Sequence, residues 1–191
     1  MGKINKTKAT AGLVVGLLAF SGAGVAVAQG GLTANLALSG TLFNIKMSHL
    51  TGSGFSLFMD SDKKGEDTMP VARLTFEQAN ASNLCLSTTL PDLPGVGEAT
   101  LALKANGDNT VDAQNLIVGA TDIAGALKLT DPQVGIDTHQ VNNAAPPGAW
   151  GLSSQAVEVR ADNILATAIG ASTLTVEGVT VSVKRGSDNA C

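Results

Sequence analysis

Ester hydrolysis by a serine nucleophile is the first chemistry that the residue types of this chain suggest. Such a reaction needs a nucleophile, a base that takes its proton and a group that orients the base. The nearest match to a nucleophile turn is Gly151-Leu-Ser153-Ser-Gln155, and His139 is the candidate base. Gln155 replaces the second glycine of the Gly-x-Ser-x-Gly motif, so the strained turn lacks the residue that permits it. Ser153 and His139 are therefore candidate catalytic residues with little support from the motif.

Calcium binding is the second candidate chemistry, in the acidic run at residues 60–67. Asp60 and Asp62 stand at the first and third positions of a calcium-binding loop. However, Lys64 occupies a ligand position and Val71 replaces the closing glutamate, and the lysines of this run repel a cation. We therefore expect a solvated turn between two strands, with Asp60 and Asp62 as candidate ligands, and we expect no cofactor.

The two cysteines of the chain are Cys85 and Cys191. In an oxidising compartment, a disulfide between them would tie the last residues to the body of the protein. On the chain-entropy account, a loop of this length contributes roughly 4–5 kcal/mol to stability. Two alternatives remain, which are two separate thiols or a Cys191 that links two chains. The sequence contains no Cys-x-x-Cys pair, which argues against redox catalysis and against a structural zinc site.

Alternation of apolar and polar residues predicts the strands that must position these side chains. The period of two holds at residues 32–38, 101–105, 127–130, 157–160, 174–176 and 179–184. Turn residues separate these stretches, notably the proline- and glycine-rich segments 91–97 and 141–151. The body is therefore predicted to be a single all-β domain.

A short phrase recurs within this pattern and suggests an architecture. Asn83, Asn115 and Asn163 each follow an Ala-x pair and precede Leu or Ile. Asparagine tolerates the left-handed backbone of a sharp corner, and its amide can bind exposed backbone groups there. Stacked corners of this kind predict a β-solenoid-like domain. The spacing of the phrase is irregular, so a β-sandwich or an open barrel is the alternative.

The first 31 residues contain the parts of a bacterial export signal. Three lysines within the first eight residues precede an uncharged apolar run at 11–28, which ends in Ala-Val-Ala. Cleavage after Ala28 would release the body, whereas retention would leave an N-terminal apolar helix of about eighteen residues as a membrane anchor. With the lysines inside, either fate places the β domain at 32–191 outside the cytoplasm, secreted or anchored in the cytoplasmic membrane.

The composition narrows the partners of this domain. The formal net charge is −4, which favours neither nucleic acid nor an anionic membrane surface. The chain has no tyrosine and one tryptophan, so it offers few platforms on which sugars or bases could stack. Trp150 follows a Pro146-Pro147-Gly148 segment. We expect this side chain either to plug one end of the core or to contact a partner or ligand.

A set of short motifs resembles a known family. These are Gln29-Gly30 at the end of the leader, Ser39-Gly40 with Phe43, Asn83-Leu84-Cys85 with Ser87, and the cysteine at position 191. Together they are similar to a family of exported proteins of unknown function from streptomycetes and related actinobacteria. Some members bear a cholesterol esterase label, and members often occur beside a small multi-spanning membrane protein. The resemblance therefore implies export and a membrane partner, and it supplies no catalytic residues.

Three functions follow from these observations. The leading hypothesis is a non-catalytic cell-envelope protein that assembles with itself or with a membrane-protein partner through the edges of its strands. The second is a carrier of lipid or another apolar small molecule, in which aliphatic strand faces line a cavity instead of filling it. The third is a serine esterase that uses Ser153 and His139.

Overall fold

The computed structural model describes residues 41–191, except 65–66, 94 and 96. Its strands are β1 (Phe43–Lys64), β2 (Asp67–Ser82), β3 (Leu84–Leu93), β4 (Gly97–Ala105), β5 (Val111–Thr130), β6 (Gln133–Asp137), β7 (Trp150–Gly170), β8 (Thr173–Val176) and β9 (Val179–Arg185), with a helical turn η1 (Thr138–Gln140). None of the helical structure in this part of the chain is long and apolar enough to cross a bilayer. The all-β prediction is confirmed. The export leader and the strand predicted at 32–38 lie outside the described residues.

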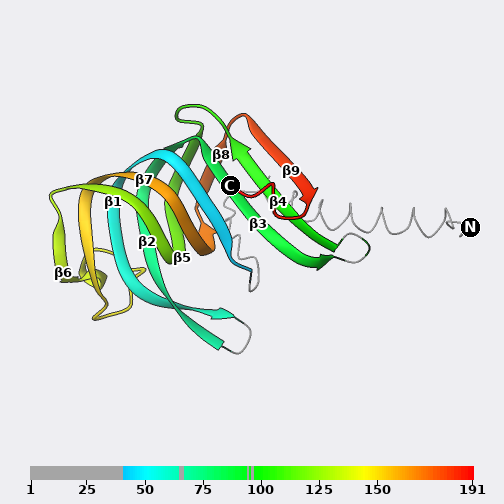
Figure 1. Ribbon diagram of the computed structural model, residues 1–191. Coiled ribbons are helices and arrows are strands. Elements are labelled where there is room, and N and C mark those ends of the chain that lie inside the picture. Colours follow the sequence, from blue (N-terminus) through cyan, green and yellow to red (C-terminus); the bar gives the residue numbers. More distant parts are fainter. Residues whose placement is uncertain (1–40, 65–66, 94, 96) are drawn as a thin grey trace, which may run out of the picture. The chain divides into compact units, whose positions relative to one another are not determined.

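The strands form one antiparallel sheet in the order β6-β7-β5-β2-β1-β3-β4-β9, with β8 beside β5. β7 also pairs with β1, so the four long strands β1, β2, β5 and β7 form a cycle of pairings. Figure 1 shows these strands curling around a common interior, with β3, β4 and β9 extending to one side. The nine strands form a single open sheet and not a closed barrel, since β3, β4 and β9 continue from β1 to a free edge at β9.

The solenoid-like stack predicted from the asparagine phrase is wrong as an architecture. Solenoids stack successive coils through parallel strands, whereas the strand pairs described here are antiparallel. The curled, open sheet is closer to the open-barrel alternative. The left-handed backbone predicted for the phrase is present at Asn83, with φ 52°, and at Asn115, with φ 50°. Only Asn83 lies at a corner between two strands, because Asn115 lies within β5.

Asn83 shows why this residue type suits the corner between β2 and β3. Its Oδ1 accepts a hydrogen bond from the Gly107 N–H at 2.9 Å, and its Nδ2 donates to Ser48 Oγ at 3.0 Å. The side chain therefore binds a backbone group that the turn leaves without a strand partner, as expected for a left-handed corner.

The predicted strands at 127–130 and 157–160 are parts of much longer elements. They belong to β5 and β7, which have 20 and 21 residues and pair with each other, so that Leu127 faces Val159. β1 has 22 residues and is longer still. Strands of this length can pair with different neighbours along their two halves, which allows the sheet to curl.

The core lies on the inner face of the curled sheet. Phe43, Ile45 and Phe55 of β1 are at most 1% exposed. Phe55 also contacts Phe76 of β2, with ring centroids 5.1 Å apart. Burial of a side chain of this size contributes about 1.5–3 kcal/mol to stability, so these residues hold β1 and β2 against the interior.

Candidate functional site

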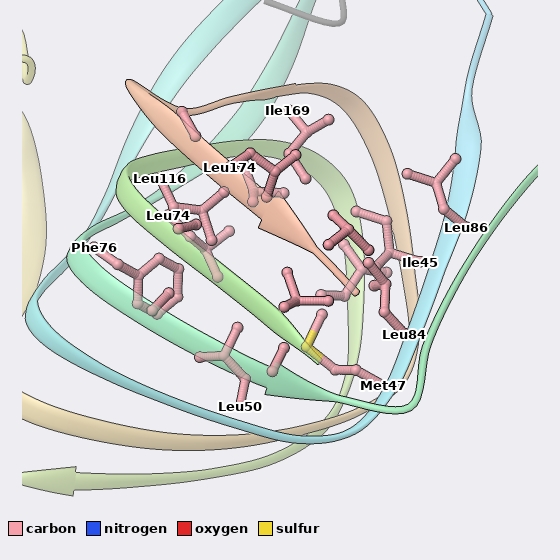
Figure 2. Close-up of a pocket in the computed structure, with 18 of the residues that line it drawn as sticks. Ile45, Met47, Leu50, Leu74, Phe76, Leu84, Leu86, Leu116, Ile169 and Leu174 are labelled. Carbon is pink, nitrogen blue, oxygen red and sulfur yellow. The ribbon is translucent and has the colours of Figure 1, made fainter. Parts of the chain in front are cut away.

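The interior of the curled sheet is not completely filled. It contains a cavity of about 150 Å³, and every side chain that lines it is apolar. Figure 2 shows the labelled lining residues pointing into this space: Ile45, Met47, Leu50, Leu74, Phe76, Leu84, Leu86, Leu116, Ile169 and Leu174. The lining comes from β1, β2, β3, β4, β5, β7 and β8, so strands far apart in the sequence build one apolar site.

Small residues explain why the cavity exists. Ala79, Ala81, Ala113 and Ala171 line it together with Gly170, and the four alanines are buried. The chain contains five phenylalanines, one tryptophan and no tyrosine, so few large side chains are present to fill the interior. The shortage of aromatic residues therefore accounts for the empty space, just as it leaves few platforms on which sugars or bases could stack.

The backbone of Gly52 fixes one wall of this cavity. A Cβ at this position would lie 2.7 Å from Cδ1 of Phe76 and 3.0 Å from the Gln78 carbonyl oxygen. The ring of Phe76 thus packs directly on the glycine backbone of the neighbouring strand. This packing leaves the space beyond the ring open.

We expect Gly52→Ala to lower the free energy of unfolding by about 1–3 kcal/mol, because the new methyl group must displace Phe76. Phe76 lines the cavity, so a ring displaced into it would also make the cavity smaller. Urea denaturation measures the first effect. Gly52→Ala should cost less stability in a Phe76→Leu background than in the wild-type protein, and an unchanged stability of Gly52→Ala alone would contradict this packing.

The structure does not join Ser153 to His139. Ser153 lies on β7 and lines a second, polar hollow of about 580 Å³, whose lining does not include His139. His139 lies in η1, where its Nδ1 is 2.7 Å from the Ala145 carbonyl oxygen. Within the described residues, no hydrogen bond links the two side chains. The neighbouring Ser154 is buried, and its Oγ lies within hydrogen-bond distance of the carbonyl oxygens of Thr130 and Ala156.

The polar hollow contains contacts that the sequence did not reveal. Asn142 Nδ2 donates to Ser56 Oγ and to Thr75 Oγ1, both at 2.7 Å, and the two hydroxyl oxygens are 2.6 Å apart. Ser56 and Thr75 face each other on β1 and β2. This network holds the loop before β7 against the sheet. The asparagine pair at 142–143 was the available signal, but its partners are 86 and 67 residues away.

Trp150 does not plug the core. It is 58% exposed at the start of β7, where it pairs with Asp137 of β6. The core-plug prediction is therefore wrong, because the loop before β7 leaves this ring on the surface. Contact of Trp150 with a partner or ligand remains a prediction.

Asp60 and Asp62 bind an arginine in this structure. Arg73 NH2 lies 2.9 Å from Asp60 Oδ2 and 2.6 Å from Asp62 Oδ1, and Thr167 Oγ1 donates to Asp62 Oδ2. Burial alone would raise the pKa of Asp62, but the hydrogen bonds from Thr167 and Arg73 and the charge of Arg73 hold this pKa below its ordinary value. The carboxylates thus serve an ion-pair network between β1, β2 and β7. Gly119 lets this network form, since a Cβ there would lie 2.7 Å from Arg73 NH1.

The predicted bridge between Cys85 and Cys191 is present, with an S–S distance of 2.06 Å. Residues 186–191, which we call the closing segment, reach the bridge across β9, β4 and β3. The Cys191 N–H donates to Ser87 Oγ at 3.0 Å, and Lys46 Nζ donates to the Cys191 carbonyl oxygen. Two separate thiols and a Cys191 that links two chains are both set aside by this pairing.

Comparison with known proteins gives one match. A family described as a family of unknown function, DUF6230, matches the chain over residues 39–191. No curated protein and no solved structure matches the chain.

Proposed function

The chain belongs to the DUF6230 family of unknown function, and because this membership transfers no activity, we propose from the cavity that the protein is a non-catalytic carrier of an apolar small molecule or lipid chain. The observation that carries this proposal is the wholly apolar lining of a cavity of about 150 Å³. A cavity without hydrogen-bonding groups offers no partners for water. An apolar ligand is the occupant that suits it.

The size of the cavity sets the size of the bound group. Engineered apolar cavities of about 150 Å³ in another protein stay dry and bind benzene or xenon. A group of six carbons would gain about 5 kcal/mol at roughly 0.8 kcal/mol per buried methylene. This corresponds to a dissociation constant on the order of 0.2 mM. The cavity is thus large enough to bind the end of an apolar ligand chain. Tighter binding of the ligand requires further apolar contacts outside the cavity.

Those further contacts are available on the extension formed by β3, β4 and β9. Leu84, Leu86 and Leu103 line the cavity and are half-buried. Leu174 of β8, outside this extension, also lines the cavity and is 44% exposed. A chain that entered beside these residues would keep one end in the cavity and lay the rest along the apolar face of the extension.

The proposed location is the cell envelope. The leader has the features of an export signal, and a disulfide between Cys85 and Cys191 suits an oxidising compartment. The similarity to exported actinobacterial proteins supports the same location and adds a small multi-spanning membrane protein as a partner that could deliver or receive the ligand. Ester hydrolysis has less support, because Ser153 and His139 do not share a hydrogen bond or a hollow in the described part of the chain.

A filled cavity tests the proposal. We expect the wild-type protein to bind benzene, and we expect Ala113→Leu to weaken this binding by about tenfold or more, because its three added carbons take up the space of the ligand. Ala113 lines the cavity and is 2% exposed. Titration with benzene followed by protein NMR measures the affinity. Native mass spectrometry after detergent-free purification tests whether a lipid from the expression host remains bound.

The matched control is Ala126→Leu, which makes the same chemical change at an exposed position on β5. This variant should bind benzene like the wild-type protein. The proposal fails if benzene at several millimolar leaves the wild-type spectrum unchanged and no lipid co-purifies. It also fails if Ala113→Leu binds as well as Ala126→Leu.

A further inference from the structure

The free edge of β9 differs from the other free edges of the sheet. β9 pairs with β4 on one side, and its other side has no partner among the described strands. Val179, Val181 and Val183 project from one face of this strand and are 45%, 58% and 65% exposed. An edge strand presents a row of unpaired N–H and C=O groups, and apolar side chains on such an edge favour pairing with another chain.

The other edges carry the features that prevent such pairing. β6 and β8 have only five and four residues. The free half of β5 contains a register shift at Gly125 and the charged Lys128. Short edges, irregular pairing and lysines are the means by which natural sheets avoid edge-to-edge association. β9 has seven residues and carries Lys184 and Arg185 only at its end, so its first five residues, Val179–Val183, lack these features.

The closing segment determines which face of β9 stays open. Asn189 Nδ2 donates to Ser182 Oγ at 3.1 Å and to the Thr100 carbonyl oxygen at 3.4 Å, and the Gly186 N–H donates to the Glu98 carbonyl oxygen at 2.9 Å. These contacts cover the face that bears Ser182. Val179, Val181 and Val183 project from the opposite face of β9. None of these hydrogen bonds lies on that face.

The open face of β9 continues the wall of the cavity. Ile45 of β1 faces Leu86 of β3, which faces Leu103 of β4, which in turn faces Val181 of β9. The first three of these side chains line the cavity. One apolar row therefore runs from the cavity to the free edge and ends at an exposed valine.

We propose that β9 pairs in antiparallel fashion with β9 of a second copy of the chain, about a two-fold axis at Val181. The sequence Val179-Thr180-Val181-Ser182-Val183 reads almost the same in both directions. Pairing centred on Val181 places Val179 of one copy opposite Val183 of the other and Thr180 opposite Ser182. A two-fold interface needs a surface that is complementary to itself, and this strand provides one.

Charge at the ends of the strand supports the same occupant. Antiparallel pairing brings Arg185 at the end of β9 in one copy near Glu177 of the other copy, which lies in the turn between β8 and β9 beside the left-handed Gly178. Both side chains are exposed, and neither forms an ion pair within the described residues. Opposite charges that face each other across strands are favourable. The two-fold axis produces this pair twice, and it joins the apolar rows of the two copies into one continuous face.

Cysteine cross-linking tests the register. We expect Val181→Cys to form a disulfide-linked dimer under mild oxidation, because the two-fold axis brings position 181 next to itself, at the roughly 4.5–5.5 Å spacing of paired Cα atoms. Val179→Cys alone should form no disulfide-linked dimer, since its two sulfur atoms would lie about 13 Å apart along the strand. A mixture of Val179→Cys and Val183→Cys should form the mixed dimer. Non-reducing mass spectrometry with peptide mapping identifies each bond.

A charge exchange provides the second measurement. Arg185→Glu and Glu177→Arg should each weaken dimerisation by about tenfold, because each creates two repulsive pairs, and the double variant should restore it. Sedimentation of the otherwise native chain measures the dimerisation constant. The proposal is overturned if the wild-type protein is a monomer at about 100 μM and Val181→Cys cross-links no faster than Val179→Cys. That outcome is expected if the free edge of β9 binds a membrane protein or a lipid surface in place of a second copy.

This inference does not depend on the apolar ligand. Val181→Asp should abolish dimerisation, while benzene binding to the cavity should stay unchanged, because Val181 does not line it. Loss of benzene binding in Ala113→Leu with an intact dimer would in turn leave the β9 pairing untouched. Failure of one proposal can therefore be told from failure of the other.

Discussion

Replacement of Cys191 by serine is expected to lower the free energy of unfolding by about 4 kcal/mol. The bridge joins residues that are 106 positions apart, so its loss releases a very large loop in the unfolded chain. The variant also frees the closing segment from β3, where the Cys191 N–H binds Ser87 Oγ. Urea denaturation of the oxidised wild-type protein and of Cys191→Ser measures the difference.

Chemical reduction is the control for this prediction. Wild-type protein treated with dithiothreitol should unfold at the urea concentration of Cys191→Ser, and the treatment should not change the variant. A difference below about 1 kcal/mol between oxidised and reduced wild-type protein would mean that packing of the closing segment, and not the bridge, holds it in place.

The second large effect is expected for Arg73→Leu. This change leaves Asp60 and Asp62 without their shared cation, in a site where their side chains are only 29% and 22% exposed. Breaking a fully buried ion pair costs about 3–5 kcal/mol, and partial exposure reduces this, so we expect a loss of about 2–3 kcal/mol at neutral pH. Urea denaturation at pH 7 measures it.

The pH dependence separates this network from simple loss of packing. The folded-state pKa of Asp62 is below its ordinary value of 3.8. The carboxylate therefore contributes stability that is present above about pH 4 and is lost as the pH falls through the folded-state pKa. Wild-type protein should lose stability in this acidic window. Arg73→Leu should lose much less there, because its carboxylates no longer have a bound cation to give up.

Lys128→Leu is the matched control. Lys128 also forms an ion pair, with Glu158 at 2.7 Å, but their side chains are 71% and 47% exposed. The hydrogen bond and charge of Lys128 lower the pKa of Glu158, yet water screens an exposed pair of this kind. The stability of Lys128→Leu should hardly change. Equal losses of stability in Lys128→Leu and Arg73→Leu would show that burial does not strengthen the Arg73 network.

The sequence was sufficient for features that depend on local chemistry. Alternation with a period of two predicted β strands, and the left-handed backbone expected of asparagine is present at Asn83 and Asn115. The disulfide partners followed from there being two cysteines. Asn163 does not share the left-handed conformation. Asn163 lies within β7 and pairs with Ala124 of β5. The register shift beside this pair occurs at Gly125, so the irregularity there does not require a left-handed asparagine.

Features set by distant pairings could not be predicted in the same way. Asp60 and Asp62 looked like ligands until the register of β1 against β2 placed Arg73 beside them. The cavity depends on the curl of four long strands and on the alanines that they bring together. Each alanine is unremarkable along the chain, and only the long-range pairings make them neighbours.

The pairing of β1 with β7 also sets the rate of folding. Phe43 faces Ala166, which lies 123 positions further along the chain (166 − 43). β1 cannot complete its hydrogen bonds until nearly all of the domain is available, and contacts of such separation slow folding to the range of about milliseconds to seconds. We expect local hairpins such as β1–β2 to form early, and the β1–β7 pairing to complete the sheet slowly. Synthesis must therefore pass residue 166 before β1 can acquire all of its neighbours.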